Sequence, residues 1–245
     1  MWEWLSASVD PTRPHEMSWA LSWHARLMIL AWGVIVPAGI FSARYLKILP
    51  WQNWPAELDS KMWWNLHWIG QSVAFALAVL GLILILMASG PHPSSLVHVT
   101  LGYAVMTFGN LQVLMGLFRG TKGGPTAPAP DGGLSGDHYD MTRFRIVFEH
   151  LHRSVGYLVL LLGAVAILTG LWTANAPRWI WGILLSYWFL LAVAAVWIQR
   201  AGRAYDTYQA IWGPDPNLPG NRMKKMGWGT VRPGDERTSS SKGVE

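Results

Sequence analysis

Long stretches without a charged residue constrain this chain more than any other feature of its sequence. Four such stretches occur, at residues 27–43, 62–118, 154–177 and 179–199. A helix needs about 20 apolar residues to cross a ~30 Å hydrocarbon core, and each stretch is long enough, the first with help from its flanks. A Gly-Pro-His-Pro sequence at residues 90–93 divides the longest stretch into two spans. Continuous apolar runs favour helices over the short alternating segments of a barrel. We therefore predict an all-α membrane protein with five transmembrane helices, at about 21–46, 62–89, 94–118, 147–173 and 178–200.

The segments outside these helices complete the predicted organisation. Residues 1–20 are expected to form an N-terminal extracytoplasmic segment, and residues 119–142 a loop rich in Gly and Pro. Residues 201–245 are expected to form a polar cytoplasmic tail, of which at least the last part is disordered. The start of the chain does not resemble a cleavable signal peptide, so the first span should be retained. Pro37 lies inside that span and should kink it.

Composition and charge exclude several classes of function. The absence of cysteine excludes disulfides, iron–sulfur clusters, thiolate zinc sites and covalent attachment of haem. With five crossings, the side that holds the N-terminus receives 3 of the 19 Lys and Arg residues, and the other side receives 16. By the positive-inside rule, the N-terminus lies outside the cell membrane and the C-terminus in the cytoplasm. The net charge of +5 thus reflects topology, and no basic stripe on a soluble domain indicates a nucleic-acid partner.

Four histidines begin four successive predicted helices, at positions 24, 67, 98 and 152. Because neighbouring helices alternate in direction, His24 and His98 share the outer face, whereas His67 and His152 share the cytoplasmic face. A single histidine at a membrane interface is usually an ordinary interfacial residue, but ionisable residues within spans are functional candidates. Two imidazoles that face each other across a bundle supply both axial ligands of a haem iron. The pairing therefore predicts a four-helix haem-binding core with two haems b per chain.

The third and fourth predicted helices repeat one spacing between histidine and glycine. Glycines follow each histidine at offsets of 4, 11 and 18, namely Gly102, Gly109 and Gly116 after His98, and Gly156, Gly163 and Gly170 after His152. At about 100° per residue, they fall within about 40° of the histidine direction. Glycine stripes in membrane helices usually mark close helix packing. Beneath paired histidines, the repeated spacing favours a channel for a flat macrocycle, with Gly102 and Gly156 beside the haems.

Other polar residues near the spans have weaker interpretations. Arg44, Lys47 and Arg153 lie at cytoplasmic helix ends, where they could pair with haem propionates or an anionic donor; contact with lipid headgroups is an equal alternative. His150 points about 200° away from the direction of His152, so the two cannot face one haem. Two polar residues, Asn110 and Gln112, lie within the third predicted span. They are expected to make hydrogen bonds between helices.

Residues 20–175 resemble the cytochrome b561 family, especially the form attached to DOMON domains. The opening "WHARLMILAWGVIVPAGIFSARYLK" is similar to that family's first core helix, and "LHWIGQ", "HVTLGY" and "HRSVGY" are similar to the openings of the next three. The resemblance implies the haem pairs His24–His98 and His67–His152. It also implies electron flow from a cytoplasmic donor, ascorbate in well-known members, to an acceptor such as ferric iron or a radical across the membrane.

We therefore expect transmembrane electron transfer through two bis-histidine b-type haems. Whether the chain is itself a transmembrane oxidoreductase is left open, because no ascorbate-site motif can be transferred residue by residue. The expected partners are membrane lipid and a small-molecule or protein electron donor and acceptor, with a homodimer or a redox partner subunit also open. Two alternatives remain: a membrane-anchoring cytochrome b subunit of a larger dehydrogenase, and a haem-free scaffold or assembly protein.

Overall fold

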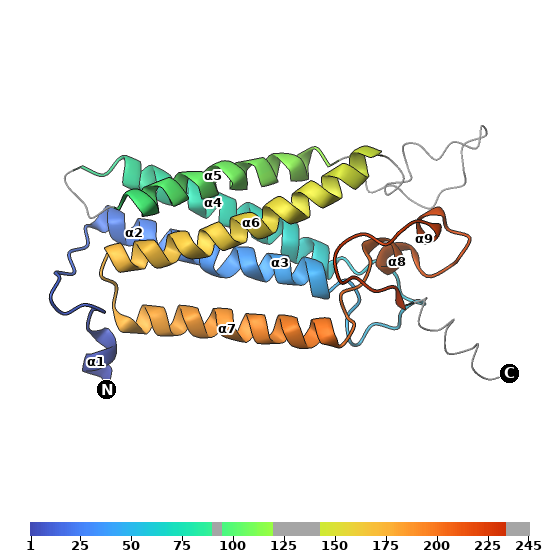
Figure 1. Ribbon diagram of the computed structural model, residues 1–245, viewed down its shortest axis with the longest axis horizontal. Helices are drawn as coiled ribbons and strands as arrows, with labels where there is room; N and C mark the ends of the chain where they lie inside the picture. Colours follow the sequence, from blue (N-terminus) through green and yellow to red (C-terminus); the bar gives the residue numbers. More distant parts are fainter. Residues whose placement is uncertain (90–94, 120–142, 234–245) are drawn as a thin grey trace. The chain divides into compact units, whose positions relative to one another are not determined.

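The computed structural model describes residues 1–89, 95–119 and 143–233, and every regular element in these residues is a helix (Figure 1). The elements are α1 (Trp2–Ser6), α2 (Trp19–Met28), the π-helix η1 (Ile29–Ile35), α3 (Val36–Tyr45), α4 (Met62–Leu86), α5 (Leu96–Leu117), α6 (Arg143–Thr173), α7 (Arg178–Arg200), α8 (Thr207–Trp212) and α9 (Pro219–Arg222). The predicted all-α class is confirmed.

Within the described residues, four helical segments are long and apolar enough to cross a membrane. They are Trp19–Tyr45, Met62–Leu86, Arg143–Thr173 and Arg178–Arg200. The chain is thus a multi-pass membrane protein. The 22-residue α5 forms where the third span is predicted, but it is not among these four helices. The count of five spans stays a prediction.

The first span changes its helical winding before Pro37, because proline removes a backbone donor. Pro37 has no N–H to give to the carbonyl of Gly33, four residues earlier. The side chain of Trp188 on α7 donates to this carbonyl instead, with Nε1 at 2.8 Å. The adjacent Tyr187 hydroxyl donates to the carbonyl of Val34 at 3.0 Å. Residues of α7 therefore satisfy carbonyls of the π-helix η1, a winding that is rare and often functional.

The chain divides into two compact units, each built from separate stretches of sequence. The first unit comprises Met1–Gly39, Trp68–Val113 and Val155–Ala194, and the second comprises Ile40–His67, Leu114–Ser154 and Ala195–Glu245. In the first unit, Trp32 of η1 packs against two apolar clusters. One contains Ile167, Leu171 and Leu184, and the other contains Val105 and Val159.

The N-terminal segment of the first unit is pinned to the turn between α6 and α7. The Asn175 side chain donates to the carbonyls of Asp10 at 2.8 Å and Arg13 at 2.7 Å, and accepts from the Asp10 N–H at 3.0 Å. Asn175 is 2% exposed and has φ 47°, a left-handed conformation that Asn tolerates better than most residues. Arg13 also donates to the Trp172 carbonyl. The predicted N-terminal extracytoplasmic segment is therefore structured.

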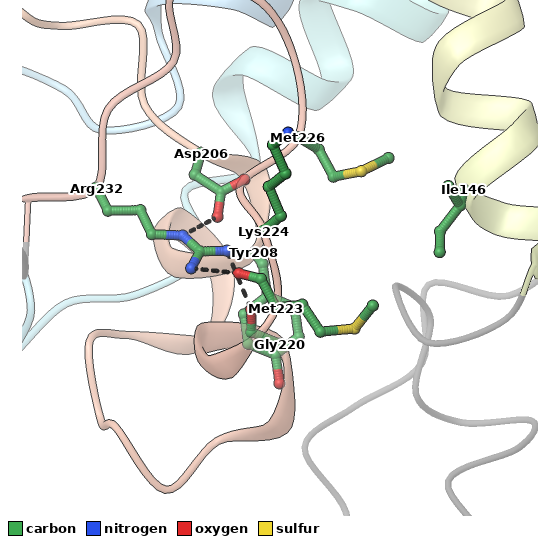
Figure 2. A pocket seen from close by; sticks show the side chains of 8 residues that line it. All are labelled: Ile146, Asp206, Tyr208, Gly220, Met223, Lys224, Met226 and Arg232. Carbon is green, nitrogen blue, oxygen red and sulfur yellow. Dashed lines mark hydrogen bonds and ion pairs between the residues drawn. The ribbon is translucent and has the colours of Figure 1, made fainter.

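In the second unit, residues 201–233 fold into a cap where the sequence indicated a polar tail. Asp206, only 2% exposed, pairs with Arg232 at 2.8 Å (Figure 2). The same guanidinium donates to the backbone carbonyls of Gly220, Asn221 and Met223. Two of the charges in this segment, those of Asp206 and Arg232, are thus satisfied internally. The predicted disordered end of the tail, residues 234–245, lies outside the described residues.

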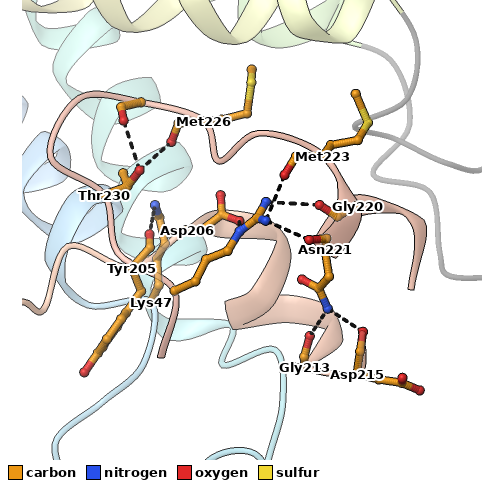
Figure 3. A network of polar contacts seen from close by, with 12 residues as sticks. Lys47, Tyr205, Asp206, Gly213, Asp215, Gly220, Asn221, Met223, Met226 and Thr230 are labelled. Atoms are coloured by element: carbon orange, nitrogen blue, oxygen red, sulfur yellow. Dashed lines mark hydrogen bonds and ion pairs between the residues drawn. The ribbon is translucent and has the colours of Figure 1, made fainter. Parts of the chain in front are cut away.

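The cap also attaches to the helical part of the second unit. Lys47, two residues beyond α3, is buried and donates through Nζ to the Tyr205 carbonyl at 2.8 Å (Figure 3). Ile48 packs with Trp54 and Ala210 in a small apolar cluster. A cavity of about 20 Å³ beside Asp206 has room for about one water molecule, so it is too small for a ligand.

Candidate cofactor site: two facing histidine pairs

The first histidine pair lies in the first unit. His24 on α2 and His98 on α5 face each other with ring centres 6.2 Å apart and planes at 89°. His24 Nδ1 lies 2.9 Å from the Gly81 carbonyl, and His98 Nδ1 lies 2.9 Å from the Ala166 carbonyl. A carbonyl accepts only from a protonated Nδ1, so both rings are held in the tautomer whose Nε2 can bind a metal.

The second pair lies in the second unit and has nearly the same geometry. His67 on α4 and His152 on α6 have ring centres 6.2 Å apart and planes at 82°. Aromatic residues flank the pair: Phe148 stacks on His152 at 5.1 Å, and Trp64 lies 6.4 Å from His67. The Nδ1 of His152 is buried and has no hydrogen-bond partner among the described residues, unlike the Nδ1 atoms of the first pair.

The separation of the rings matches what a shared iron requires. A transition metal holds an imidazole nitrogen at about 2 Å and the ring centre lies about 1.1 Å further out, so two opposed ligands have centres about 6 Å apart. Both pairs are at 6.2 Å. Within the described residues, no three His, Asp or Glu side chains gather into a metal site. The histidines occur as pairs, which suits a cofactor that brings its own equatorial ligands.

The other histidines are placed differently. His150 is exposed, so it does not share the inward direction of His152. His15 lies outside the helices, with Nδ1 2.9 Å from the Ala174 carbonyl. His92 and His138, expected in loops, lie outside the described residues.

The glycines on α5 leave space for a flat group in each unit. A Cβ atom added to Gly102, one turn from His98, would meet no atom within 4 Å, and the same holds for Gly116 in the second unit. At Gly156 on α6, a Cβ atom would lie 3.7 Å from Oε1 of Gln112, which is ordinary contact. Gly102 and Gly116 therefore face open space, one in each unit.

The glycine groove is not continuous, because Trp32 fills its middle. A Cβ atom on Gly109 would lie 2.7 Å from the Trp32 ring, and one on Gly163 would lie 3.6 Å from it. The two equivalent glycines therefore accommodate an indole instead of a macrocycle. Gly170 likewise accommodates an imidazole, since its added Cβ would lie 2.7 Å from Cε1 of His98. The repeated spacing thus serves packing against a ring at three positions, leaves open space at two, and gives ordinary contact with Gln112 at the sixth, Gly156.

The three basic candidates in the second unit all have protein partners. Arg44 Nη2 donates to Oε1 of Gln199 and to the Trp228 carbonyl, both at 2.9 Å. Lys47 is bonded to the cap as described above. Arg153 pairs with Glu149 at 2.7 Å. Of the three, Arg153 directly follows His152 of the second histidine pair in the sequence.

Two charged residues near His152 were missed by the sequence interpretation. Arg145, 5% exposed, pairs with Glu149 at 2.8 Å, and Glu149 also binds Arg153, so that one carboxylate bridges two guanidinium groups. The spacing of four residues between successive members is the signal that could have revealed this ion triad. Its net positive charge adds to that of Lys47, whose pKa is lowered to about 7 by burial and by the nearby Arg153.

Sequence comparison finds curated relatives, among them proteins of Arabidopsis thaliana. A cytochrome b561, DM13 and DOMON domain-containing protein of Arabidopsis thaliana is 28% identical over 178 residues, covering 71% of this chain and 17% of that protein. Two cytochrome b561 and DOMON domain-containing proteins of Arabidopsis thaliana are 29% identical over 198 residues and 26% identical over 162 residues. These matches cover 76% and 65% of this chain, but 42% and 29% of the relatives. The chain therefore spans less than half the length of these relatives. No protein-family model matches it, and no solved structure matches it.

Proposed function

Because the chain is a relative of cytochrome b561 and DOMON domain-containing proteins, we propose that it transfers electrons across a membrane through two haems b. The observation that carries the proposal is the pair of facing imidazoles in each unit, both with ring centres 6.2 Å apart. His24 and His98 are the axial ligands of one haem, and His67 and His152 are those of the other.

Bound haem supplies one-electron redox chemistry, and two axial histidines favour outer-sphere transfer over oxygen binding because no coordination position is open. The protein's own groups prepare each site. The carbonyls of Gly81 and Ala166 fix the orientation of the first pair. Phe148 and Trp64 shield the second pair with aromatic surface. The open positions at Gly102 and Gly116 leave room for the macrocycle.

Positive charge beside the second pair has a role in this proposal. Arg145 and Arg153 share the one carboxylate of Glu149, which leaves one net positive charge in this triad to balance anionic groups. Haem propionates are such groups, and Arg153 is the best placed because it follows His152 directly in α6. Arg44 donates to the Trp228 carbonyl of the cap, so we assign it a structural role in holding the cap.

We propose that the second pair lies on the cytoplasmic side and receives electrons there, whereas the first pair delivers them outside. The support is the distribution of basic residues, 3 against 16, over the two sides of the predicted topology. Reporter fusions at both ends test this orientation. A fusion at Glu245 that is active outside the cytoplasm would overturn it.

The direct test of the cofactor is to purify the protein and record reduced-minus-oxidised spectra with a pyridine haemochrome count. We expect two haems b per chain; one haem would mean that one pair is not a site, and a colourless protein would favour the scaffold alternative. The other alternative is a membrane-anchoring cytochrome b subunit of a larger dehydrogenase. A stable copurifying dehydrogenase and no reduction by ascorbate would favour that alternative.

A further inference from the structure

One loop of the cap, residues 226–230, is attached to the ends of two membrane-spanning helices. Nη2 of Arg44, one residue before the end of α3, donates to the Trp228 carbonyl at 2.9 Å. Nε2 of Gln199, one residue before the end of α7, donates to the Gly229 carbonyl at 2.7 Å. Both helices form the ends of apolar spans, so the loop lies where these spans leave the hydrocarbon core.

Internal bonds and backbone geometry fix the shape of this loop. The Thr230 hydroxyl bonds to the carbonyls of Met226 at 3.0 Å and Gly227 at 2.9 Å (Figure 3). Gly227 and Gly229, on either side of Trp228, have φ of 97° and 61°, in the left-handed region that glycine enters without strain. The loop therefore holds Trp228 in a defined position at the surface of the second unit.

Trp228 and the residues that precede it form a surface that is both aromatic and basic. Trp228 is 85% exposed, so its indole ring packs against little of the protein. Arg222, Lys224 and Lys225 are exposed as well. Residues 216–233 contain four Lys or Arg residues and no Asp or Glu. Carboxylates of the same segment therefore do not balance the positive charge of this surface.

A membrane surface suits each of these features. Indole rings concentrate at the boundary between headgroups and acyl chains, where the apolar ring leaves water and the N–H keeps a polar partner. Lysines close to a membrane-spanning helix are attracted to anionic headgroups. Charge alone would not select a lipid over another anion. The loop, however, is held at the ends of α3 and α7, where headgroups are always present.

We propose that the cap docks on the membrane through this surface, with Trp228 inserted among the headgroups and Lys224 and Lys225 bound to anionic phospholipid. Docking requires no rearrangement, because the bonds to α3 and α7 already hold the loop in place. The docked loop also covers Arg153, since a Cβ atom added to Gly227 would collide with Nη1 of this arginine.

Single spin labels test the depth of the loop, since the chain has no cysteine. A nitroxide on Trp228→Cys, in nanodiscs of mixed phosphatidylcholine and phosphatidylglycerol, should collide more with oxygen, which concentrates in lipid, than with a water-soluble nickel chelate. Asn217→Cys is the matched control, because Asn217 is exposed on the same cap but bonds to Asp215 and has no adjacent lysine. The nickel chelate should dominate there. Equal accessibility at the two positions would overturn the proposal.

Trypsin tests the role of anionic lipid with Trp228 in place. Cleavage after Lys224 and Lys225 should be about fivefold to 25-fold slower with phosphatidylglycerol than in phosphatidylcholine alone, because each lysine at an anionic surface contributes about fivefold. Cleavage follows the population of undocked loop when docking is fast. The new cleavage site in Asn217→Lys is the control, and its rate should not depend on the lipid.

Two substitutions separate the indole from the charges. Trp228→Ala should restore most of the cleavage in the mixed nanodiscs, whereas Trp228→Tyr, which also suits the interface, should keep most of the protection. The thermal midpoint shows that each variant folds. Equal cleavage rates in the two kinds of nanodisc, or protection that Trp228→Ala retains in full, would contradict the proposal. None of these measurements depends on haem content.

Discussion

Substituting Gly170 by alanine should remove one haem, because the added methyl group collides with a proposed iron ligand. The new Cβ would lie 2.7 Å from Cε1 and 3.0 Å from Nδ1 of His98. Carbon atoms in contact settle at about 3.5 Å or more, so the imidazole has to move by about 0.8 Å. Metal–ligand distances tolerate about 0.2 Å, and the 2.9 Å contact of Nδ1 with the Ala166 carbonyl would also be disturbed. The displacement is therefore several times what an iron–histidine bond accepts.

Gly163→Ala is the matched control on the same helix. Its new Cβ would lie 3.6 Å from the Trp32 ring, which is ordinary contact, although Gly163 and Gly170 belong to the same repeated glycine pattern. Haem per chain is measured by pyridine haemochrome, and electron paramagnetic resonance distinguishes six-coordinate low-spin from high-spin haem. We expect Gly170→Ala to retain one low-spin haem and Gly163→Ala to retain two. Equal haem content in the two variants would refute the argument from His98 geometry.

Three further substitutions test the fold around the sites. Trp188→Phe leaves the Gly33 carbonyl without its side-chain donor and should lower stability by about 1–3 kcal/mol, measured as a lower thermal midpoint. An unchanged midpoint would mean that another donor replaces the indole N–H. Arg232→Met leaves the buried Asp206 without its ion-pair partner and should lower stability by about 3–5 kcal/mol. Limited proteolysis should then cut within residues 201–233. A cap that resists the protease would argue against the ion pair as its anchor. Burial, and then a neighbouring arginine, lower the pKa of Lys47 from its ordinary value of 10.5 to about 7. Between pH 7 and pH 10.5, the folded chain therefore binds fewer protons than the unfolded chain. Stability should therefore rise with pH in that range, by on the order of 4 kcal/mol, and Lys47→Met should flatten the rise in thermal midpoints measured at pH 7 and 9.5.

The facing histidines were accessible from sequence because they depend on simple topology. In the predicted topology, each of four long helices has a histidine near its start, and the alternation of helix direction sorts these histidines into two pairs, His24 with His98 and His67 with His152. The structure brings the same pairs together, with ring centres at 6.2 Å. Their binding of haem iron stays a prediction.

The packing around the histidines could not be predicted in the same way. Equal glycine spacing does not say which flat group fills the gap, so the insertion of Trp32 between Gly109 and Gly163 was not foreseen. The cap was missed for a related reason. Its buried pair, Asp206 and Arg232, is 26 residues apart in sequence, and no local pattern joins such residues.

The central claim, two separate bis-histidine haems, is tested most directly by haem content and spectra of the four single ligand variants. His24→Ala or His98→Ala should remove or convert to high spin only one haem, and His67→Ala or His152→Ala only the other, because each pair lies in its own unit. His150→Ala is the control and should keep both haems, since His150 is exposed. If all four variants lose the same single haem, or if His150→Ala loses a haem that His152→Ala retains, the account is wrong.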